Sequence, residues 1–230
     1  MAAETAPCFS RNRFWILRHG KSIPNEQGLI VSSMENGILP EYQLGSEGVA
    51  QAQLAGEKFL KELKDANIAL ENVRICYSPF SRTAHTARVV ASVLNIPFEG
   101  PQCKAFEDIR ERYFGPSYEL SSYERYPEIW DLDEKDPFEQ PEGGESVADV
   151  VSRLITAIEQ IETIYEGCAI LIVSHGDPLQ MLQTVLSAAK EQNESNCSNL
   201  GSRLTAVKVP SVLSKHRNFA LETAELRAVI

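Results

Sequence analysis

The chain has 230 residues, of which 43% are hydrophobic and 23% are charged, and its formal net charge is −10. This composition is ordinary for a globular protein, and the length suits one large α/β domain. The negative charge argues against nucleic acid or an anionic membrane surface as a partner. It would also repel an anionic substrate, so a site for such a substrate needs arginines of its own.

The cysteines are scattered and show no C-x-x-C spacing: Cys8, Cys76, Cys103, Cys168 and Cys197. An odd, scattered set fits reduced thiols in a cytosol-like compartment better than a disulfide framework. No stretch approaches the roughly 20 apolar residues of a membrane-spanning helix. Residues 1–12 lack the apolar segment of a signal peptide and are too few for a usual transit peptide. These features predict a soluble, cytoplasmic protein.

Strands and helices alternate along the first half of the chain. Residues 14–17 are an apolar strand, and the Gly-, Pro- and Asn-rich segment 20–45 indicates a long, functional loop. A helix opens at Ser46 and keeps its apolar residues at helical spacing. A β-branched run predicts a second strand over 73–77, and a helix follows over about 81–94.

The second half begins with an irregular segment, rich in proline and aromatic residues, over about 99–144. We interpret it as a cap-like insertion within one domain that spans residues 1–230. Ser146 can cap a long helix with a clear apolar stripe, and Gly167 ends it. The remaining elements expected are a strand over 168–173, a helix from Pro178 to about 188, a polar loop over 190–201, and strands near 203–209 and 218–227.

Two of these strands end in a histidine that is followed by glycine. Leu17-Arg18-His19-Gly20 leaves the first strand, and Ser174-His175-Gly176 leaves a later one. In open α/β sheets, ligands bind beyond the carboxyl ends of the strands. A neutral imidazole is a competent nucleophile. An adjacent arginine lowers the pKa of a histidine and can donate two hydrogen bonds to a phosphoryl group. The glycine allows backbone and ligand to approach closely.

A second arginine and a group of carboxylates complete the set. Arg82 lies in the first turn of the helix after strand 73–77, where backbone N–H groups and the helix dipole favour an anion. Carboxylates stand among arginines over residues 107–112, and a carboxylic acid with a raised pKa could protonate a leaving oxygen there. No spacing in the set is typical of a metal site. The residues therefore predict metal-free phosphoryl transfer through a phosphohistidine.

Longer motifs around these residues resemble those of the histidine phosphatase superfamily, the phosphoglycerate-mutase-like proteins. Leu17-Arg18-His19-Gly20-x-Ser22-x-x-Asn25 is similar to the family signature. Five further segments resemble family motifs in the same order along the chain: 44–52, 78–87, 110–115, 143–146 and 173–176. The resemblance implies an α/β fold, a three-layer α/β/α sandwich with a mostly parallel central sheet and a small inserted cap.

The resemblance also implies a role for each matching position. His19 becomes the nucleophile, and Glu111 donates a proton to the leaving alkoxide and then activates water. Arg18 and Arg82 clamp the phosphoryl oxygens, and His175 adds a hydrogen bond to the same group. The other substrate contacts implied by the family or its motifs are Ser22, Asn25 and Gly176. The resemblance implies no metal and no cofactor.

The position of the proton donor stays open, because Glu107 and Asp108 lie within one helical turn of Glu111. The Arg-Glu-Arg-aromatic-aromatic-Gly context favours Glu111. Glu107 and Asp108 are otherwise expected to be structural or solvated. His85 is expected to pack rather than to act in catalysis, and His216 to lie on the surface in a basic turn. The cap aromatics are expected mainly in its core, with one or two lining the pocket: Tyr113, Phe114, Tyr118, Tyr123, Tyr126 and Trp130.

The family contains both phosphatases and mutases. Gln180 stands where a mutase usually has arginine, and the cap is rich in carboxylates and tyrosines, so we expect hydrolysis of a small phosphomonoester. A bisphosphoglycerate-dependent phosphoglycerate mutase and a low-activity regulatory or binding protein remain alternatives. A protein-phosphotyrosine phosphatase, the identity of the substrate and a homodimer also stay open. Gly45 and Pro116 depart from the family pattern, which leaves the shape of the pocket open.

Overall fold

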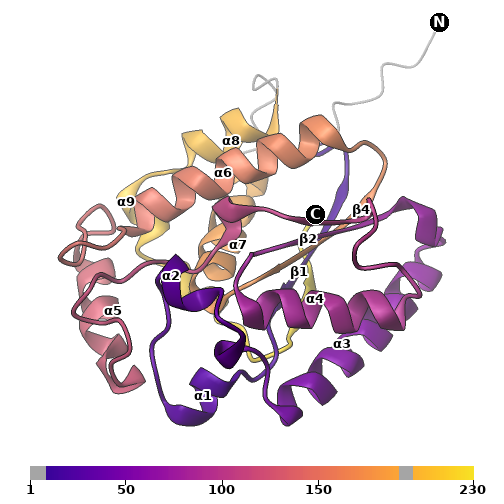
Figure 1. Ribbon diagram of the computed structural model, residues 1–230. Helices are drawn as coiled ribbons and strands as arrows, with labels where there is room; N and C mark the ends of the chain where they lie inside the picture. Colours follow the sequence, from indigo (N-terminus) through magenta and orange to yellow (C-terminus); the bar gives the residue numbers. More distant parts are fainter. Residues whose placement is uncertain (1–8, 192–198) are drawn as a thin grey trace, which may run out of the picture.

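The computed structural model describes residues 9–191 and 199–230 (Figure 1). Its centre is a five-stranded sheet made of β1 (Arg13–Arg18), β2 (Val73–Tyr77), β3 (Cys103–Ala105), β4 (Ala169–Ser174) and β5 (Leu226–Ala228). The strands lie in the order β3-β2-β4-β1-β5, and β5 alone among the described strands runs antiparallel to its neighbour. The mostly parallel sheet expected from the sequence is confirmed.

The register of β1 on β4 brings the two strand-end histidines to one place. Arg18 at the end of β1 is paired with Ser174 at the end of β4. The next backbone N–H, that of His19, donates to the Ser174 carbonyl at 3.0 Å. His19 and His175 therefore leave neighbouring strands at the same edge of the sheet, where parallel strands place their ligands.

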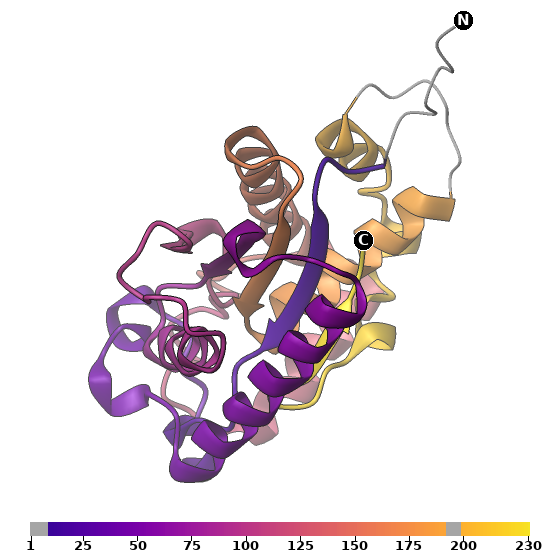
Figure 2. The same cartoon turned by 90° about the vertical axis from the view of Figure 1, so that its right-hand side faces the viewer.

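Helices pack on both faces of the sheet, so the molecule has three layers (Figures 1 and 2). On one face, Trp15 and Leu17 of β1 belong to a buried cluster shared with α3 and α4. On the other face, Phe14 and Ile16 belong to a cluster shared with α6, α7 and α8. The helices concerned are α3 (Ser46–Asp65), α4 (Ser81–Val93), α6 (Val147–Ile164), α7 (Gly176–Glu191) and α8 (Leu200–Ala206).

Local sequence explains where the longer helices begin. Ser146 caps α6 in a capping box, because its side chain accepts the Asp149 N–H while the Asp149 carboxylate accepts the Ser146 N–H. Gly45 precedes α3 and makes no side-chain cap hydrogen bond. The predicted helices over α3, α4 and α6 are confirmed, and α7 begins at Gly176, two residues before Pro178.

The expected loop 20–45 is more ordered than its composition suggests. It contains the short helices α1 (Ile23–Gln27) and α2 (Met34–Gly37) and the 3₁₀ turn η1 (Pro40–Tyr42). Ser22 and Ser33 cap the two helices, and Gly28 ends α1 in the left-handed conformation. Elements of four or five residues carry too little periodicity to be found in a sequence.

The segment 99–144 is also less irregular than expected. Its first part forms β3, which pairs with β2 and belongs to the sheet. The rest contains the 3₁₀ turns η3 (Glu107–Ile109) and η4 (Tyr123–Arg125) and the helix α5 (Tyr126–Lys135). The remaining 3₁₀ turns of the chain are η2 (Leu70–Asn72) and η5 (His216–Phe219).

The late strands were placed wrongly from the sequence. Residues 203–206 lie in α8, and the next element after α8 is another helix, α9 (Pro210–Leu213). The expected strand over 203–209 is therefore absent there. The expected strand over 218–227 begins only at Leu226, because η5 and a loop precede β5. Short amphipathic helices with β-branched residues mimic strands when tertiary packing decides between the two.

Three cysteines within the described residues are free thiols: Cys76, Cys103 and Cys168. Cys8, Cys197, residues 1–8 of the N-terminal lead and residues 192–198 of the expected polar loop lie outside the described residues. Among the helices of the described ranges, none combines the length and apolar character needed to span a membrane.

Candidate active site

A cavity of about 310 Å³ opens beyond the carboxyl ends of β1 and β4. All but one of the predicted site residues line it: Arg18, His19, Ser22, Asn25, Arg82, Glu111 and Gly176. His175 is fully buried and does not line the cavity, but its ring centroid is 5.3 Å from that of His19. The cavity thus brings together residues that are distant in the sequence, from the sheet edge, the start of α4 and the segment after η3.

His19 is held as a neutral imidazole with its lone pair on one defined nitrogen. Its Nδ1 lies 2.7 Å from the Gly20 carbonyl, which can only accept, so Nδ1 carries the proton. Nε2 then accepts a hydrogen bond from Arg82 Nε at 3.2 Å. Burial, and then the charges of Arg82 and Arg18, hold the pKa of His19 well below its usual value. The reactive lone pair is therefore available at neutral pH.

Arg82 connects the nucleophile to the acid. It is 4% exposed, and its Nη2 donates to the Val31 carbonyl at 3.0 Å and to Glu111 Oε2 at 3.4 Å. Arg18 reaches the cavity from the end of β1 and donates through Nη1 to the Leu221 carbonyl at 2.6 Å. Burial lowers the pKa of Arg82, and the Glu111 charge acts against that shift.

His175 is oriented by Ser78, the first residue of the loop between β2 and α4. Ser78 Oγ lies 2.8 Å from His175 Nε2 and also accepts the Phe80 N–H at 3.4 Å. Because Oγ already accepts from the backbone, its own proton is free to donate to Nε2. The imidazole proton then sits on Nδ1, which lies 3.6 Å from Glu111 Oε2. Burial, and then the Arg82 charge, hold the pKa of His175 well below its usual value.

Three of the buried nitrogens that lack a hydrogen-bond partner within the described residues surround this pair of rings: Arg18 Nε, Arg82 Nη1 and His175 Nδ1. A buried polar group without a partner costs about 1–3 kcal/mol, so each such group calls for an explanation. A ligand with several acceptor oxygens would satisfy all three. The site is therefore shaped for an anion next to the His19 lone pair.

Glu111, and not Glu107 or Asp108, lies at the cavity. It is 8% exposed, and burial raises its pKa to about 7, with the Arg82 charge acting in the opposite direction. Its Oε1 accepts the Arg112 N–H at 3.0 Å. Glu107 is exposed, and neither it nor Asp108 lines the cavity. A carboxyl group with this pKa can give and take a proton near neutral pH.

Ser22 and Asn25 line the cavity, and they also shape it. They form the capping box of α1: Asn25 Oδ1 accepts from Ser22 N at 3.1 Å and from Ser22 Oγ at 2.9 Å. The amide oxygen of Asn25 is thereby engaged, which leaves its NH₂ group as the one available to a ligand.

Gly20 is needed for a different contact from the one expected. A Cβ at Gly20 would collide with the backbone carbonyl of Gly48 in α3, and a Cβ at Gly48 would collide with the Lys21 carbonyl. The close approach is therefore between the segment after His19 and the first turn of α3. It fixes the backbone that carries His19 rather than making room for a ligand.

Comparison with known proteins agrees with the motifs. The profile of the Histidine phosphatase superfamily (branch 1) matches residues 14–224. The chain belongs to this superfamily. A metal-independent phosphoserine phosphatase of Arabidopsis thaliana is 26% identical over 179 residues, which cover 76% of this chain and 68% of that protein. A putative phosphoserine phosphatase 2 of Hydrogenobacter thermophilus is 26% identical over 187 residues, covering 79% and 81%.

Solved structures show the same fold. A mycobacterial glucosyl-3-phosphoglycerate phosphatase with VO3 superposes with a TM-score of 0.66 over 93% of this chain and 88% of that chain, at 18% identity. The α/β/α arrangement of this superfamily member is thus shared with its structural neighbours, and the sequence-based assignment of the fold is confirmed.

In this member of the superfamily, the motif Gly143-Gly144-Glu145-Ser146 holds the Glu111 segment in place. Arg153 of α6 donates to the backbone carbonyls of Asp108, Arg110 and Glu111 at 2.8–3.1 Å. Glu145 pairs with Arg153 Nε at 2.8 Å and accepts the Tyr113 N–H at 2.9 Å. Sequence reasoning matched this motif to the family but missed what it does, because its partners lie far away along the chain.

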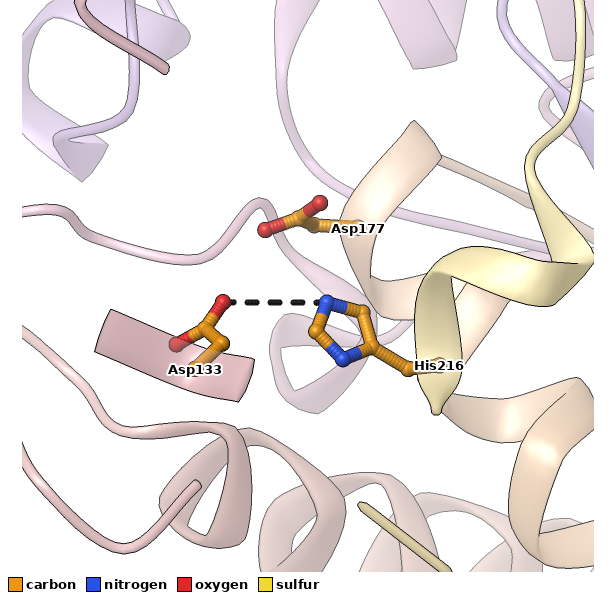
Figure 3. Close-up of side chains that lie close together, drawn as sticks. All are labelled: Asp133, Asp177 and His216. Atoms are coloured by element: carbon orange, nitrogen blue, oxygen red, sulfur yellow. Dashed lines mark ion pairs between the residues drawn. The ribbon is translucent and has the colours of Figure 1, made fainter. Parts of the chain in front are cut away.

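Asp133, Asp177 and His216 form a cluster at the cavity: Asp177 is part of its wall, and Asp133 and His216 are buried beside it (Figure 3). The prediction that His216 lies on the surface is wrong, because it is 1% exposed. The neighbouring lysine and arginine indicate a solvated turn, yet η5 packs on α7 and turns this one side chain inward, with Nδ1 3.0 Å from the Leu213 carbonyl.

The cluster has ligand types that suit a divalent metal, with atoms within 4.8 Å of one another. However, Arg112 Nη1 already lies 2.6 Å from Asp133 Oδ2 and 3.6 Å from Asp177 Oδ2. A metal ion at these oxygens would face a buried guanidinium, where like charges repel strongly. We therefore interpret the cluster as an ion-pair network that joins α5, η5 and the start of α7.

Aromatic residues of the cap line the cavity to a greater extent than expected. Phe114, Tyr126 and Trp130 are in its wall, whereas Tyr123 is 53% exposed on the surface. Arg217 of η5 completes this side of the cavity. Nothing in the sequence indicated that Arg217 lines the cavity, because the C-terminal segment reaches the cap only through tertiary packing.

Proposed function

We propose that this chain is a metal-independent phosphatase that hydrolyses a small phosphomonoester through a phosphohistidine on His19. The observation that carries the proposal is a set of donors around the His19 lone pair, on Arg18, Arg82 and His175, that have no partner among the residues the structure describes. A phosphoryl group offers three acceptor oxygens and develops negative charge in the transition state, which such donors stabilise. The relatives named as phosphoserine phosphatases support the same reaction class.

In the first step, His19 Nε2 attacks phosphorus as the bond from phosphorus to the leaving oxygen breaks. The electron pair of that bond stays on the oxygen, which takes the proton of Glu111. Arg82 leaves its hydrogen bond to Nε2 and donates to the phosphoryl oxygens with Arg18 and His175 Nδ1. His19 Nδ1 keeps its proton and continues to donate it to the Gly20 carbonyl, so the ring stays in place as it gains charge.

In the second step, the Glu111 carboxylate takes a proton from water, and the water oxygen attacks phosphorus. The bond from phosphorus to Nε2 breaks, its electron pair returns to the imidazole, and inorganic phosphate leaves. Glu111 then holds a proton for the next cycle. The pKa of about 7 that burial gives Glu111 suits both directions of transfer.

One cavity residue, Gln180, favours hydrolysis over the mutase reaction, in which the phosphoryl group returns to the substrate. Gln180 lines the cavity where mutases usually carry arginine, so the wall lacks a guanidinium there. The free thiols of Cys76, Cys103 and Cys168 support the cytoplasm as the compartment we propose.

The experiment is phosphate release from a panel of phosphomonoesters, with EDTA present, by the natural protein and by His19→Ala. The panel includes phosphoserine and glucosyl-3-phosphoglycerate. We expect turnover that survives EDTA and disappears in His19→Ala, with an acid-labile phosphoenzyme trapped only in the natural protein. His85→Ala is the matched control, because this histidine does not line the cavity, and it should keep full activity. Equal turnover by the natural protein and His19→Ala would contradict the mechanism.

A further inference from the structure

The cavity extends well beyond the place of the phosphoryl group. Its volume of about 310 Å³ lies at the lower end of small-molecule sites, which leaves room for the leaving group. The phosphoryl end is closed, since His19 is 3% and Arg82 4% exposed. The outer part of the wall includes Trp130 of α5 and Arg217 of η5, whose side chain is exposed. This outer end is where the part of a substrate beyond the phosphate would lie.

Arg217 is held flat against an aromatic stack. Its Cζ lies 3.4 Å from the centroid of the Trp130 ring. Trp130 in turn lies parallel to Tyr126, with an interplanar angle of 4° and ring centroids 5.8 Å apart. Stacking binds the face of a guanidinium and leaves its N–H groups, which lie in the plane, free to donate.

The backbone beneath Arg217 is also fixed. His216, the preceding residue, points into the protein and places Nε2 3.7 Å from Asp133 Oδ2 (Figure 3). Asp133 lies in α5, one turn after Trp130, and accepts two hydrogen bonds from Arg112. Two neighbouring residues of η5 thus contact two neighbouring turns of α5, so Arg217 is positioned before any ligand arrives.

Apart from the stack on Trp130, the guanidinium of Arg217 has no hydrogen-bond or ion-pair partner in residues 9–191 and 199–230. No carboxylate of those residues lies within 4.0 Å of it, although Asp131 and Glu134 line a second hollow together with Trp130 and Arg217. Of the acidic groups in the cavity wall, Asp177 lies 3.6 Å from Arg112, and Glu222 is exposed to solvent. An arginine that is oriented, stacked and unpaired in a cavity wall is suited to an oxyanion.

We propose that Arg217, stacked on Trp130, binds a second anionic group of the substrate, a carboxylate or a second phosphate on the leaving group. The inference rests on the proposed phosphatase function and narrows its substrate class to phosphomonoesters with a further negative charge. The net charge of −10 makes such a residue necessary, because the chain as a whole repels a polyanion. A substrate with an uncharged leaving group would gain nothing from Arg217.

The test is calorimetric titration at low ionic strength with three non-hydrolysable probes. Propylphosphonate carries one anionic group, 3-phosphonopropionate adds a carboxylate, and propane-1,3-bisphosphonate adds a second phosphonate. We expect the natural protein to bind at least one of the last two about threefold to tenfold more tightly than propylphosphonate. Whichever probe gains identifies the second group as a carboxylate or a phosphate.

The variant Arg217→Gln should lose this preference and keep its affinity for propylphosphonate. Arg88→Gln is the matched control, because Arg88 is also exposed and stacked, 4.8 Å over Phe98, but lies outside the cavity. Equal binding of all three probes by the natural protein, or a preference that survives in Arg217→Gln, would overturn the inference while leaving the proposed function standing. Failure of every probe to bind the natural protein would contradict the phosphoryl site itself.

Discussion

Two pairs of arginines in this molecule, buried except for the half-buried Arg18, have opposite surroundings. Arg112 makes a bidentate pair with Asp133 at 2.6 and 2.8 Å, and Arg153 makes one with Glu145 at 2.8 and 3.0 Å. Both also donate to backbone carbonyls. Arg82, although 4% exposed, and Arg18 each keep a buried nitrogen without a partner in the described part of the chain.

The pKa values of Arg112 and Arg82 shift in opposite directions. Burial opposes the charge of Arg112, but hydrogen bonds and the charge of Asp133 outweigh it and raise its pKa. Burial lowers the pKa of Arg82, and Glu111 does not compensate for it fully. An arginine that stabilises the fold finds its counter-charge inside the protein. One that binds a ligand leaves part of its hydrogen-bonding capacity for that ligand, at a cost in stability.

Replacing one arginine of each kind should separate stability from activity. Arg112→Met leaves Asp133 buried without its partner, and we expect the free energy of unfolding to fall by about 3–5 kcal/mol. Arg82→Met removes a buried charge that lacks a full set of partners. We expect its free energy of unfolding to stay within about 1 kcal/mol of the natural value, whereas kcat/KM for phosphate release falls by about 10²–10³-fold.

Urea denaturation and phosphate-release kinetics on both variants make this comparison. Arg112→Met should keep kcat/KM per folded molecule much closer to the natural value than Arg82→Met does. If Arg82→Met were as destabilised as Arg112→Met, the two arginines would play the same structural part, and the contrast between them would be wrong.

Glu111 offers a second comparison, between a buried carboxyl group at the site and an exposed one on the same segment. Burial raises the pKa of Glu111 from its ordinary value of 4.5 to about 7. Between these values the folded chain binds more protons than the unfolded chain. The contribution of Glu111 to stability is therefore complete below about pH 4.5 and is lost as the pH rises towards 7.

We expect Glu111→Gln to remove this dependence. At pH 8 the variant should be more stable than the natural protein by roughly 3 kcal/mol, and below pH 4.5 the two should converge. Glu107→Gln, an exposed change four residues earlier, should leave the stability profile unaltered. Thermal unfolding across pH 4–8 measures all three proteins. A natural protein whose stability is flat over this range, relative to Glu111→Gln, would contradict a buried, protonated Glu111.

The fold could be predicted from the sequence where elements were long and buried on one face. The apolar runs of β1 and β4 and the stripe of α6 carry strong periodic signals, and each was located within one or two residues. The errors concern elements that depend on tertiary contacts. β3 and β5 have three residues each, and α8 occupies a segment that had suggested a strand.

The candidate site divides in the same way. Arg18, His19, Arg82 and Glu111 stand in motifs, and parallel strands bring such motifs to one edge, so the sequence could place them together. Arg217 and Trp130 come from segments without a motif, and only packing of η5 on α5 makes them neighbours. Glu145 was matched to a motif, but its contact with Arg153 could not be read from the spacing.

A smaller effect than those of Arg82 and Glu111 is expected at Ser78, which acts through His175 rather than on the substrate. Ser78→Ala removes the hydroxyl that donates to His175 Nε2, so the ring proton is no longer confined to Nδ1. We expect kcat/KM to fall about tenfold, the size expected for loss of one hydrogen bond, with the fold retained.

The tautomer itself can be observed without turnover, through the ¹⁵N chemical shifts of the His175 ring. The natural protein should show a protonated Nδ1, and Ser78→Ala a mixture of the two neutral forms. Ser78→Thr keeps a hydroxyl and should restore the first pattern. A natural protein with the proton on Nε2 would mean that His175 donates to Ser78, and Nδ1 would then face the site as a lone pair that cannot bind a phosphoryl oxygen.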